Sequence, residues 1–383
     1  MIDIPFTRLL LITMLTALCL SNNVSHSLSV LSPVKKNSRQ VPSSNNGNVS
    51  LGKQSTALDV LTYLNKNSLL ANYVTHNNDK KRQPVVVVTG GSSGIGLPTV
   101  ETLSLAGMKV VLCARNVTSA QMVIENEIPK SLQANILIQE MDLSDMASIE
   151  AAVMDIVKEE CSGSDIDGDI DVLLNNAGVM APPKRLSTVQ GLELQFGTNH
   201  VGHHMLTRLL LPYMRNDGRI VTVASTAHAF GSLDFANLNY DVDAKSQRLY
   251  TSWGAYGQSK LANVLFAKSL DDKLKETGSN IKSVSLHPGV IGTNLWRYSP
   301  SWTKPFLSSI VADKNAQQGA ATNVFCCLVE SSKFNGGEYL MDCEIAQPNS
   351  QGKDESGNLR KQLWDATELL ITNNGYTLPK DVY

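Results

Sequence analysis

The sequence lacks a strong excess of charge of either sign. It has 33 Lys and Arg residues against 35 Asp and Glu residues, which leaves a formal net charge of -2 at pH 7. There is also no long basic run, so the chain lacks the positive surface that nucleic acid binding requires. Nucleic acid is therefore excluded as an expected partner, and the 42% hydrophobic content indicates an ordinary globular protein.

Cysteine is scarce, and its spacing carries no pattern. The six cysteines form no Cys-x-x-Cys pair and no repeated interval, so there is no sign of a disulfide framework, and we expect reduced thiols. Three histidines, His200, His203 and His204, have helical spacing, but no carboxylate or cysteine lies in register with them. We therefore predict no metal site.

The apolar run near the N-terminus is too short to cross a bilayer comfortably. Arg8 precedes "LLLITMLTALCL" (9–20), and polar "SNNVSHS" follows it. A basic residue, a short apolar core and a polar exit are typical of a signal peptide, which we predict over residues 1–20 together with its alternative, a signal anchor. Either would direct the chain to the endoplasmic reticulum or its membrane. A plastid-type organelle presequence is the other interpretation.

Composition and apolar periodicity divide the rest of the chain into three parts. Residues 21–83 are rich in Ser, Asn and Lys and indicate a polar linker or presequence, apart from a short amphipathic helix expected around Leu58, Leu61 and Leu64. We expect one domain over 84–345 and a C-terminal extension with a short helix over 346–383.

The domain alternates short apolar runs with longer helical patterns. Near-continuous apolar runs that are each followed by a helix indicate a parallel sheet covered on both faces, so we predict a doubly wound α/β (Rossmann) fold of about seven strands. The expected strands are 85–90, 109–115, 135–142, 169–178, 218–225, 281–289 and 337–342. In such sheets ligands bind outside the carboxyl ends of the strands.

The first expected strand runs into "TGGSSGIG" (89–96), which opens a helix. Gly90, Gly94 and Gly96 would let the backbone turn tightly and approach a pyrophosphate at the helix N-terminus. The second strand ends in "CAR", with Ala114 and Arg115 where the adenosine ribose would lie. Because no carboxylate stands there and a guanidinium can pair with a 2′-phosphate, the pattern favours NADP(H).

The segment "AYGQSKLAN" (255–263) places Tyr256 and Lys260 four residues apart at the start of a long helical run. Residues at this spacing share one helix face, so the ammonium can lie near the phenol. An ammonium held there favours the phenolate and would lower the tyrosine pKa from its ordinary value near 10. The pair alone is a weak signal, because a solvated surface pair has the same spacing.

Together these motifs resemble the short-chain dehydrogenase/reductase family over about residues 84–342. The matching segments are "TGGSSGIG" (89–96), "MDLSD" (141–145), "NNAG" (175–178), "TNHVGHHMLT" (198–207), "VTVASTAH" (221–228), the Tyr-x-x-x-Lys pair and "HPGVIGT" (287–293). The resemblance implies a catalytic set of Tyr256, Lys260, Ser225 and Asn199. It implies cofactor contacts from Gly90, Ser92, Ser93, Gly94, Ile95, Gly96, Arg115, Asp142, Leu143, Asn176, Ala177, Gly178, Tyr256, Lys260, Pro288, Gly289 and Thr293.

By the same resemblance, Tyr256 transfers the proton, Ser225 donates to the substrate oxygen, and Asn199 anchors a water that links Lys260 to solvent. Several segments look most like the retinol dehydrogenase and WW-domain oxidoreductase branch, which implies an apolar retinoid- or steroid-like substrate under an apolar lid between Thr293 and Lys314. Membrane association through the N-terminal segment and a homo-oligomer stay open.

Two alternatives accompany this interpretation. A light-dependent protochlorophyllide reductase shares the fold and the Tyr/Lys pair, but that family has a cysteine where this chain has Ala262, and "NNAA" where it has "NNAG". A non-catalytic NADP(H)-sensing module would be expected to have lost Tyr256 or Lys260, and both are present.

Overall fold

The computed structural model describes residues 50–75, 82–161, 169–291 and 313–380. The segment predicted to be a signal peptide or anchor lies outside these ranges. So do Thr293 and nearly all of the proposed lid. Among the helices in the described ranges, none is both long enough and apolar enough to cross a membrane.

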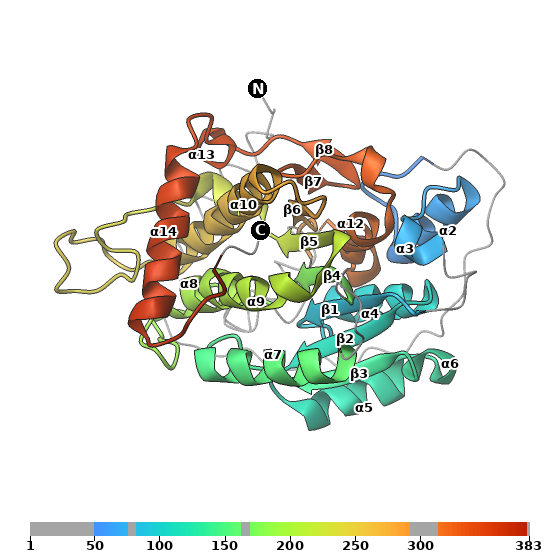
Figure 1. Ribbon diagram of the computed structural model, residues 1–383. Helices are drawn as coiled ribbons and strands as arrows, with labels where there is room; N and C mark the ends of the chain where they lie inside the picture. The colour runs from blue at the N-terminus through green and yellow to red at the C-terminus, as the bar shows by residue number, and fades with distance from the viewer. Residues whose placement is uncertain (1–49, 76–81, 162–168, 292–312, 381–383) are drawn as a thin grey trace, which may run out of the picture. The chain divides into compact units, whose positions relative to one another are not determined.

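The sheet is doubly wound, as predicted, and has the strand order β3-β2-β1-β4-β5-β6-β7-β8 (Figure 1). Neighbouring strands from β3 to β7 pair in parallel, and the short β8 is antiparallel to β7. The bounds are β1 (Val85–Thr89), β2 (Lys109–Ala114), β3 (Ile136–Glu140), β4 (Ile170–Asn175), β5 (Met214–Val223), β6 (Lys282–His287), β7 (Tyr339–Met341) and β8 (Glu344–Ala346). The strand order reverses between β1 and β4, which is where such folds bind ligands.

Alternate residues of each strand face opposite sides of the sheet and build two separate cores. Val85 and Val87 of β1 belong to the core beneath one set of helices, whereas Val86 and Val88 belong to the other. Because both faces are buried, the strand reads as an unbroken apolar run rather than an alternating one.

The helices fall on the two faces of the sheet. The first core includes residues of α7 (Met146–Glu160), α9 (Gly202–Leu210), α10 (Ser252–Glu276) and α14 (Asn358–Asn373). The second includes residues of α2 (Ala57–Lys66), α4 (Gly96–Leu105), α5 (Val117–Glu127) and α12 (Ala316–Leu328). Shorter elements are α3 (Asn72–Thr75), α6 (Lys130–Gln133), α8 (Leu194–Phe196), the π-helical turn η2 (Gly197–Val201), η3 (Leu211–Tyr213), η4 (Thr226–Phe230), η7 (Ser331–Lys333) and α13 (Ser350–Lys353).

Helix α2 lies within the stretch expected to be mostly linker, and it packs against α12. It begins at a capping box formed by Thr56 and Asp59. Its buried residues are Ala57, Val60 and Leu64, whereas Leu58 is 51% exposed. The expected amphipathic helix is therefore present, but its buried face is rotated away from Leu58.

A buried arginine joins this N-terminal segment to the sheet. Arg219 of β5 is 1% exposed, and its Nη1 donates to the carbonyl oxygens of Cys326 (2.8 Å) and Val329 (2.6 Å) at the end of α12. These carbonyls have no partner within the helix, so a cation there satisfies them and complements the helix dipole. The Tyr73 ring of α3 covers the guanidinium at 5.3 Å.

The C-terminal extension contains α14, which runs beside α10 (Figure 1). Trp364 stacks on Phe266 of α10 at 5.8 Å between ring centroids, and Arg208 of α9 pairs with Glu368 at 2.8 Å. The extension thus contributes Leu363, Trp364 and Ile371 to the first core.

Replacing Leu64 by alanine should lower the free energy of unfolding by about 2–4 kcal/mol, because it leaves a cavity between α2 and α12. Leu58→Ala is the matched control on the same helix and should change it by less than about 0.5 kcal/mol. Urea denaturation measures both. Equal effects of the two variants would show that α2 does not pack on the domain in solution.

Candidate active site

The ends of β1 and β4 are joined through one hydroxyl group. Thr89 Oγ1 accepts hydrogen bonds from the backbone nitrogens of Asn176 and Ala177, both at 2.9 Å. The Asn176 side chain also binds this strand end, because its Nδ2 donates to the carbonyl oxygens of Thr89 (2.8 Å) and Gly90 (3.2 Å). The "NNAG" segment therefore holds the start of the glycine turn.

The glycine turn excludes side chains at two points. Gly90 has a φ of +66°, and a Cβ there would lie 2.9 Å from the Cα of Ala177. A Cβ on Gly96 would lie 2.2 Å from the carbonyl oxygen of Gly90. The turn can close onto α4 only with glycine at both positions, and Ser92, Ser93 and Ile95 complete it. The N-terminus of α4 therefore lies at this edge of the sheet, where backbone N–H groups and the helix dipole favour an anion.

Arg115 and Asp142 follow the ends of the two adjacent strands β2 and β3. Arg115 is exposed and makes no hydrogen bond or ion pair with the residues that the structure describes. Asp142 is partly buried, and its Oδ1 accepts from the backbone nitrogen (2.8 Å) and Oγ (2.7 Å) of Ser144. Leu143 beside it is buried and its carbonyl packs on Gly202 of α9.

Tyr256 and Lys260 lie in the first half of α10 and are 5% and 4% exposed. The Lys260 Nζ donates to the Val223 carbonyl oxygen at 2.9 Å and lies 5.7 Å from the centroid of the Tyr256 ring. The four-residue spacing of Tyr256 and Lys260 therefore does bring the two side chains together, on a buried rather than a solvated face.

Burial dominates the ionisation of this pair. It raises the pKa of Tyr256 to about 12, and a hydrogen bond with the Ser225 side chain acts in the opposite sense. It lowers the pKa of Lys260 to about 8. The expectation that Lys260 lowers the Tyr256 pKa below its ordinary value is therefore wrong for this structure, because burial of the phenol raises that pKa.

Ser225 follows β5 and caps η4, where its Oγ accepts from the Ala227 nitrogen at 3.2 Å. Asn199 lies in the π-helical turn η2, a feature common at functional sites. Its side chain pairs with both backbone groups of Val179, at 2.8 and 2.9 Å. A Cβ on Gly178 would lie 3.3 Å from Asn199 Oδ1 and 3.7 Å from Lys260 Nζ, so the asparagine and the lysine meet at this glycine.

Pro288 and Gly289 follow β6 on the same edge of the sheet. Gly289 has a φ of +97°, and a Cβ there would lie 2.5 Å from Cδ of Lys314. The Lys314 ammonium pairs with Asp342 at 2.5 Å. The carboxyl edge thus gathers the predicted residues except Thr293, which lies outside the described ranges.

Sequence reasoning missed several residues that hold this site together. Thr89 is the first residue of the "TGGSSGIG" motif, and its position at the end of a strand was the only sequence feature that could have indicated its role. Asn323 of α12 donates to Asn176 Oδ1 (3.2 Å) and Thr99 Oγ1 (3.3 Å), and Ser259 accepts from Asn199 Nδ2 (3.0 Å). No spacing in the sequence links Asn323 to its partners.

The three helical histidines have different partners. His203 contacts Thr89 Oγ1 through Nε2 (2.8 Å) and the Asn199 carbonyl through Nδ1 (2.9 Å). His200 contacts Thr367 (3.0 Å), and the His204 ring packs on Trp364. No group of metal-ligating side chains occurs in the described part of the chain.

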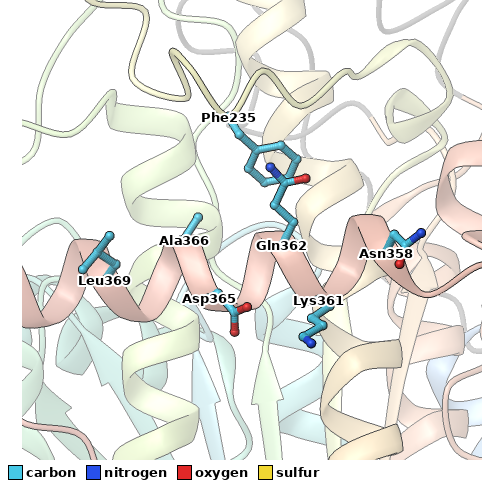
Figure 2. A pocket seen from close by; sticks show the side chains of 7 residues that line it. All are labelled: Phe235, Asn358, Lys361, Gln362, Asp365, Ala366 and Leu369. Atoms are coloured by element: carbon cyan, nitrogen blue, oxygen red, sulfur yellow. The ribbon is translucent and has the colours of Figure 1, made fainter.

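An open cavity of about 340 Å³ lies along α14 (Figure 2). Its lining consists of Phe235, Asn358, Lys361, Gln362, Asp365, Ala366 and Leu369. None of these is a residue of the candidate active site, so the cavity is separate from the chemistry described above.

Known proteins resemble this chain in sequence and in fold. A family model described as short chain dehydrogenase matches residues 84–237. The chain is 36% identical over 306 residues to "Short-chain dehydrogenase TIC 32 B, chloroplastic" of Brassica napus, covering 78% of this chain and 91% of the relative. It is 36% identical over 287 residues to retinol dehydrogenase 11 of Homo sapiens, covering 74% and 84%.

A crystal structure of an uncharacterised protein from Mycobacterium paratuberculosis shares the fold with a TM-score of 0.60 and 28% identity, covering 85% of this chain and 99% of that one. Salutaridine reductase from Papaver somniferum has a TM-score of 0.50 at 21% identity and covers 67% of this chain, which shows likeness of fold alone.

Two site histidines should make stability depend on pH. Burial lowers the pKa of His203 and of His287 to about 4, from 6.5. Because the unfolded chain binds these protons first, their contribution is fully present above pH 6.5 and is lost as pH falls toward 4. Each proton contributes a slope of up to about 1.4 kcal/mol per pH unit.

The variant His203→Gln isolates one of these protons. Its unfolding free energy, measured by urea denaturation from pH 7.5 to 5, should fall less steeply than that of the wild type. Burial also raises the pKa of the Asp171 and Glu193 carboxyl groups, so their contribution to the free energy of unfolding increases as pH falls and opposes that of the histidines. The difference between the wild type and the variant removes this contribution, because both proteins share it. Parallel curves for the two proteins would contradict a neutral, buried His203.

Proposed function

The chain belongs to the short-chain dehydrogenase family, and we propose that it is an NADP(H)-dependent oxidoreductase acting on an apolar alcohol or carbonyl substrate. The observation that carries the proposal is one constellation. The Tyr256 phenol lies near enough to the Ser225 side chain for it to lower the phenol pKa, and the Lys260 ammonium lies 5.7 Å from the centroid of the Tyr256 ring, at the sheet edge that also bears the glycine turn.

The residues at this edge fit a nicotinamide dinucleotide. The glycine turn packs against Ala177 and its own backbone with no room for side chains at Gly90 and Gly96, which fits the tight turn of a pyrophosphate site, and the exposed Arg115 follows β2 where a 2′-phosphate would lie. The cofactor supplies a hydride when bound. Gly90, Gly94 and Gly96 would hold its phosphates, with Asp142, Asn176 and Gly289 on the neighbouring strand ends.

The chain's own residues supply the proton and the orientation. The raised pKa of Tyr256 keeps its phenol protonated at neutral pH, which is the form that donates a proton during carbonyl reduction. Ser225 donates to the substrate oxygen as negative charge develops there. Lys260 lies beside Asn199 and Gly178 and would receive replacement protons from solvent through a water anchored by Asn199.

The substrate class and the location are parts of the same proposal. The relative named retinol dehydrogenase 11 supports a retinoid-like apolar substrate, and the short apolar run after Arg8 supports a place at the endoplasmic reticulum. The relative whose name includes "chloroplastic" supports a plastid and keeps a protochlorophyllide-like substrate as the second candidate. A non-catalytic NADP(H) sensor is the third, and turnover distinguishes it from both.

A screen of NADPH oxidation tests the function directly. Purified protein that retains residues 50–383, because α2 belongs to the core, is assayed with retinal, steroid ketones, aliphatic aldehydes and illuminated protochlorophyllide. Turnover of retinal or steroid ketones supports the first candidate. Tight NADPH binding without turnover of any carbonyl compound would instead support the non-catalytic NADP(H) sensor.

Tyr256→Phe should reduce kcat at least about a hundredfold, because it removes the transferable proton and leaves the ring in place. The Kd for NADPH should stay within about twofold of the wild-type value, since the variant loses one hydroxyl of a cofactor site built from many contacts. Steady-state kinetics and fluorescence titration measure the two quantities. Retention of more than about a tenth of wild-type kcat would remove Tyr256 from the acid/base role.

Arg115→Ala should weaken NADPH by about ten- to a hundredfold, the usual contribution of a charge-assisted contact to phosphate. NADH should be almost unaffected, since its ribose carries a neutral hydroxyl. Ala114→Asp should also weaken NADPH, because the new carboxylate repels the phosphate, and it should favour NADH by giving its ribose hydroxyls an acceptor. Values of kcat/KM for both cofactors test this, and equal losses for NADPH and NADH in Arg115→Ala would make the arginine a structural residue.

A further inference from the structure

Two imidazole rings hold the peptide unit that follows the candidate catalytic serine. The Ser225 carbonyl oxygen accepts from Nδ1 of His228 at 2.6 Å and from the His228 backbone nitrogen at 3.0 Å. The nitrogen of the same peptide unit, that of Thr226, donates to Nδ1 of His287 at 3.3 Å. Both polar groups of this one peptide are therefore bound by histidine side chains.

These contacts assign the proton on each ring. A carbonyl oxygen only accepts, so His228 must carry hydrogen on Nδ1, and its Nε2 accepts from the Asn349 backbone nitrogen at 3.1 Å. A backbone N–H only donates, so Nδ1 of His287 must be unprotonated. The two rings are thus both neutral and in opposite tautomers.

We propose that His228 and His287 are positioning residues, which together clamp the Ser225–Thr226 peptide and so aim the Ser225 hydroxyl at Tyr256 and the substrate oxygen. The role of the clamp in turnover rests on the proposed function. The clamp itself does not, because it is a property of the folded chain.

The position of the peptide explains why a clamp matters. Ser225 has extended backbone angles (φ −165°, ψ 156°) at the junction between β5 and η4. Rotation of this peptide would move the backbone nitrogen of Ala227, which donates to Ser225 Oγ at 3.2 Å, and would so release the serine hydroxyl from its orientation. A hydroxyl that stabilises a developing oxyanion must stay within hydrogen-bonding distance, so fixing the peptide preserves the donor.

The clamp also ties the active site to the C-terminal part of the chain. Asn349 precedes α13, and besides its contact with His228 its Nδ2 donates to the Ala229 carbonyl at 3.3 Å. The ring of Tyr339 in β7 packs edge-on against His228 at 5.1 Å. Residues more than a hundred positions downstream thereby support the serine loop.

The surroundings of both rings agree with neutral imidazoles. His228 is 4% and His287 is 5% exposed, and burial lowers the pKa of each. The charged groups that act on His287 are Lys314, which opposes a second proton, and Asp313 and Asp342, which favour one. A second proton on either ring would place two donors face to face.

Nitrogen NMR of protein labelled with ¹⁵N-histidine tests the clamp without any substrate. Long-range ¹H–¹⁵N spectra near pH 7.5 should show His228 with its proton on Nδ1 and His287 with its proton on Nε2. The signals are assigned through His228→Asn and His287→Asn. A His228 ring protonated on Nε2, or a His287 ring protonated on Nδ1, would overturn the proposal whether or not the protein turns over NADPH.

Paired substitutions then test the effect on turnover. His287→Leu removes the acceptor for Thr226 and His228→Leu removes the donor to Ser225, so each should lower kcat about tenfold or more while the Kd for NADPH stays nearly constant. His287→Asn and His228→Asn each offer one replacement polar atom and should recover most of that loss. His204→Leu, a buried histidine that contacts α14, is the control for loss of a ring.

The outcome is read against that control. If the leucine variants at 228 and 287 lose stability as His204→Leu does but keep wild-type kcat, the two rings are structural only and the positioning role is wrong. If wild-type protein shows no turnover, the proposed function fails, and the tautomers still decide whether the clamp exists.

Discussion

The hydroxyl group of Thr89 is the constraint on which the rest of the site depends. It has one proton and two lone pairs, and both lone pairs accept backbone N–H groups from Asn176 and Ala177. Its proton must therefore go to Nε2 of His203, whose Nδ1–H then reaches the Asn199 carbonyl. One side chain at the end of β1 thus sets the spacing between the glycine turn, the end of β4 and the helix that carries Asn199.

This arrangement is fixed by the burial of its polar groups. Thr89, Asn199 and His203 are almost completely buried, so an unsatisfied polar atom among them would be costly. The same burial keeps the Tyr256 phenol protonated and makes the Lys260 ammonium easier to deprotonate. Low polarity therefore does two things at this edge of the sheet. It holds the geometry rigid, and it prepares Tyr256 to donate a proton.

Local patterns predicted most of the fold and the reactive side chains. The apolar runs located seven strands, of which the central ones are buried on both faces whereas β3 is only partly buried, and the four-residue spacing located Tyr256 and Lys260 on one face of α10. What the sequence did not reveal depends on contacts between distant segments. No local spacing in the sequence indicates the contact of Asn323 with Asn176, the packing of α14 on α10 or the contact between Asn349 and His228. The short strand β8 escaped because three residues carry too little pattern. Leu58 was wrongly assigned to the buried face of α2, because the packing of α2 on α12, which is distant in sequence, determines which residues are covered.

The most direct test of the account is the fate of the hydride. NADPH that carries deuterium at C4, in each of its two configurations, is incubated with the protein and the carbonyl substrate that it turns over fastest, and the alcohol product is analysed by mass spectrometry. The account predicts that one of the two cofactors yields an alcohol with one deuterium on the former carbonyl carbon, and that the other yields none. Oxidation of NADPH with no deuterium in the product from either cofactor would contradict direct hydride transfer at this site.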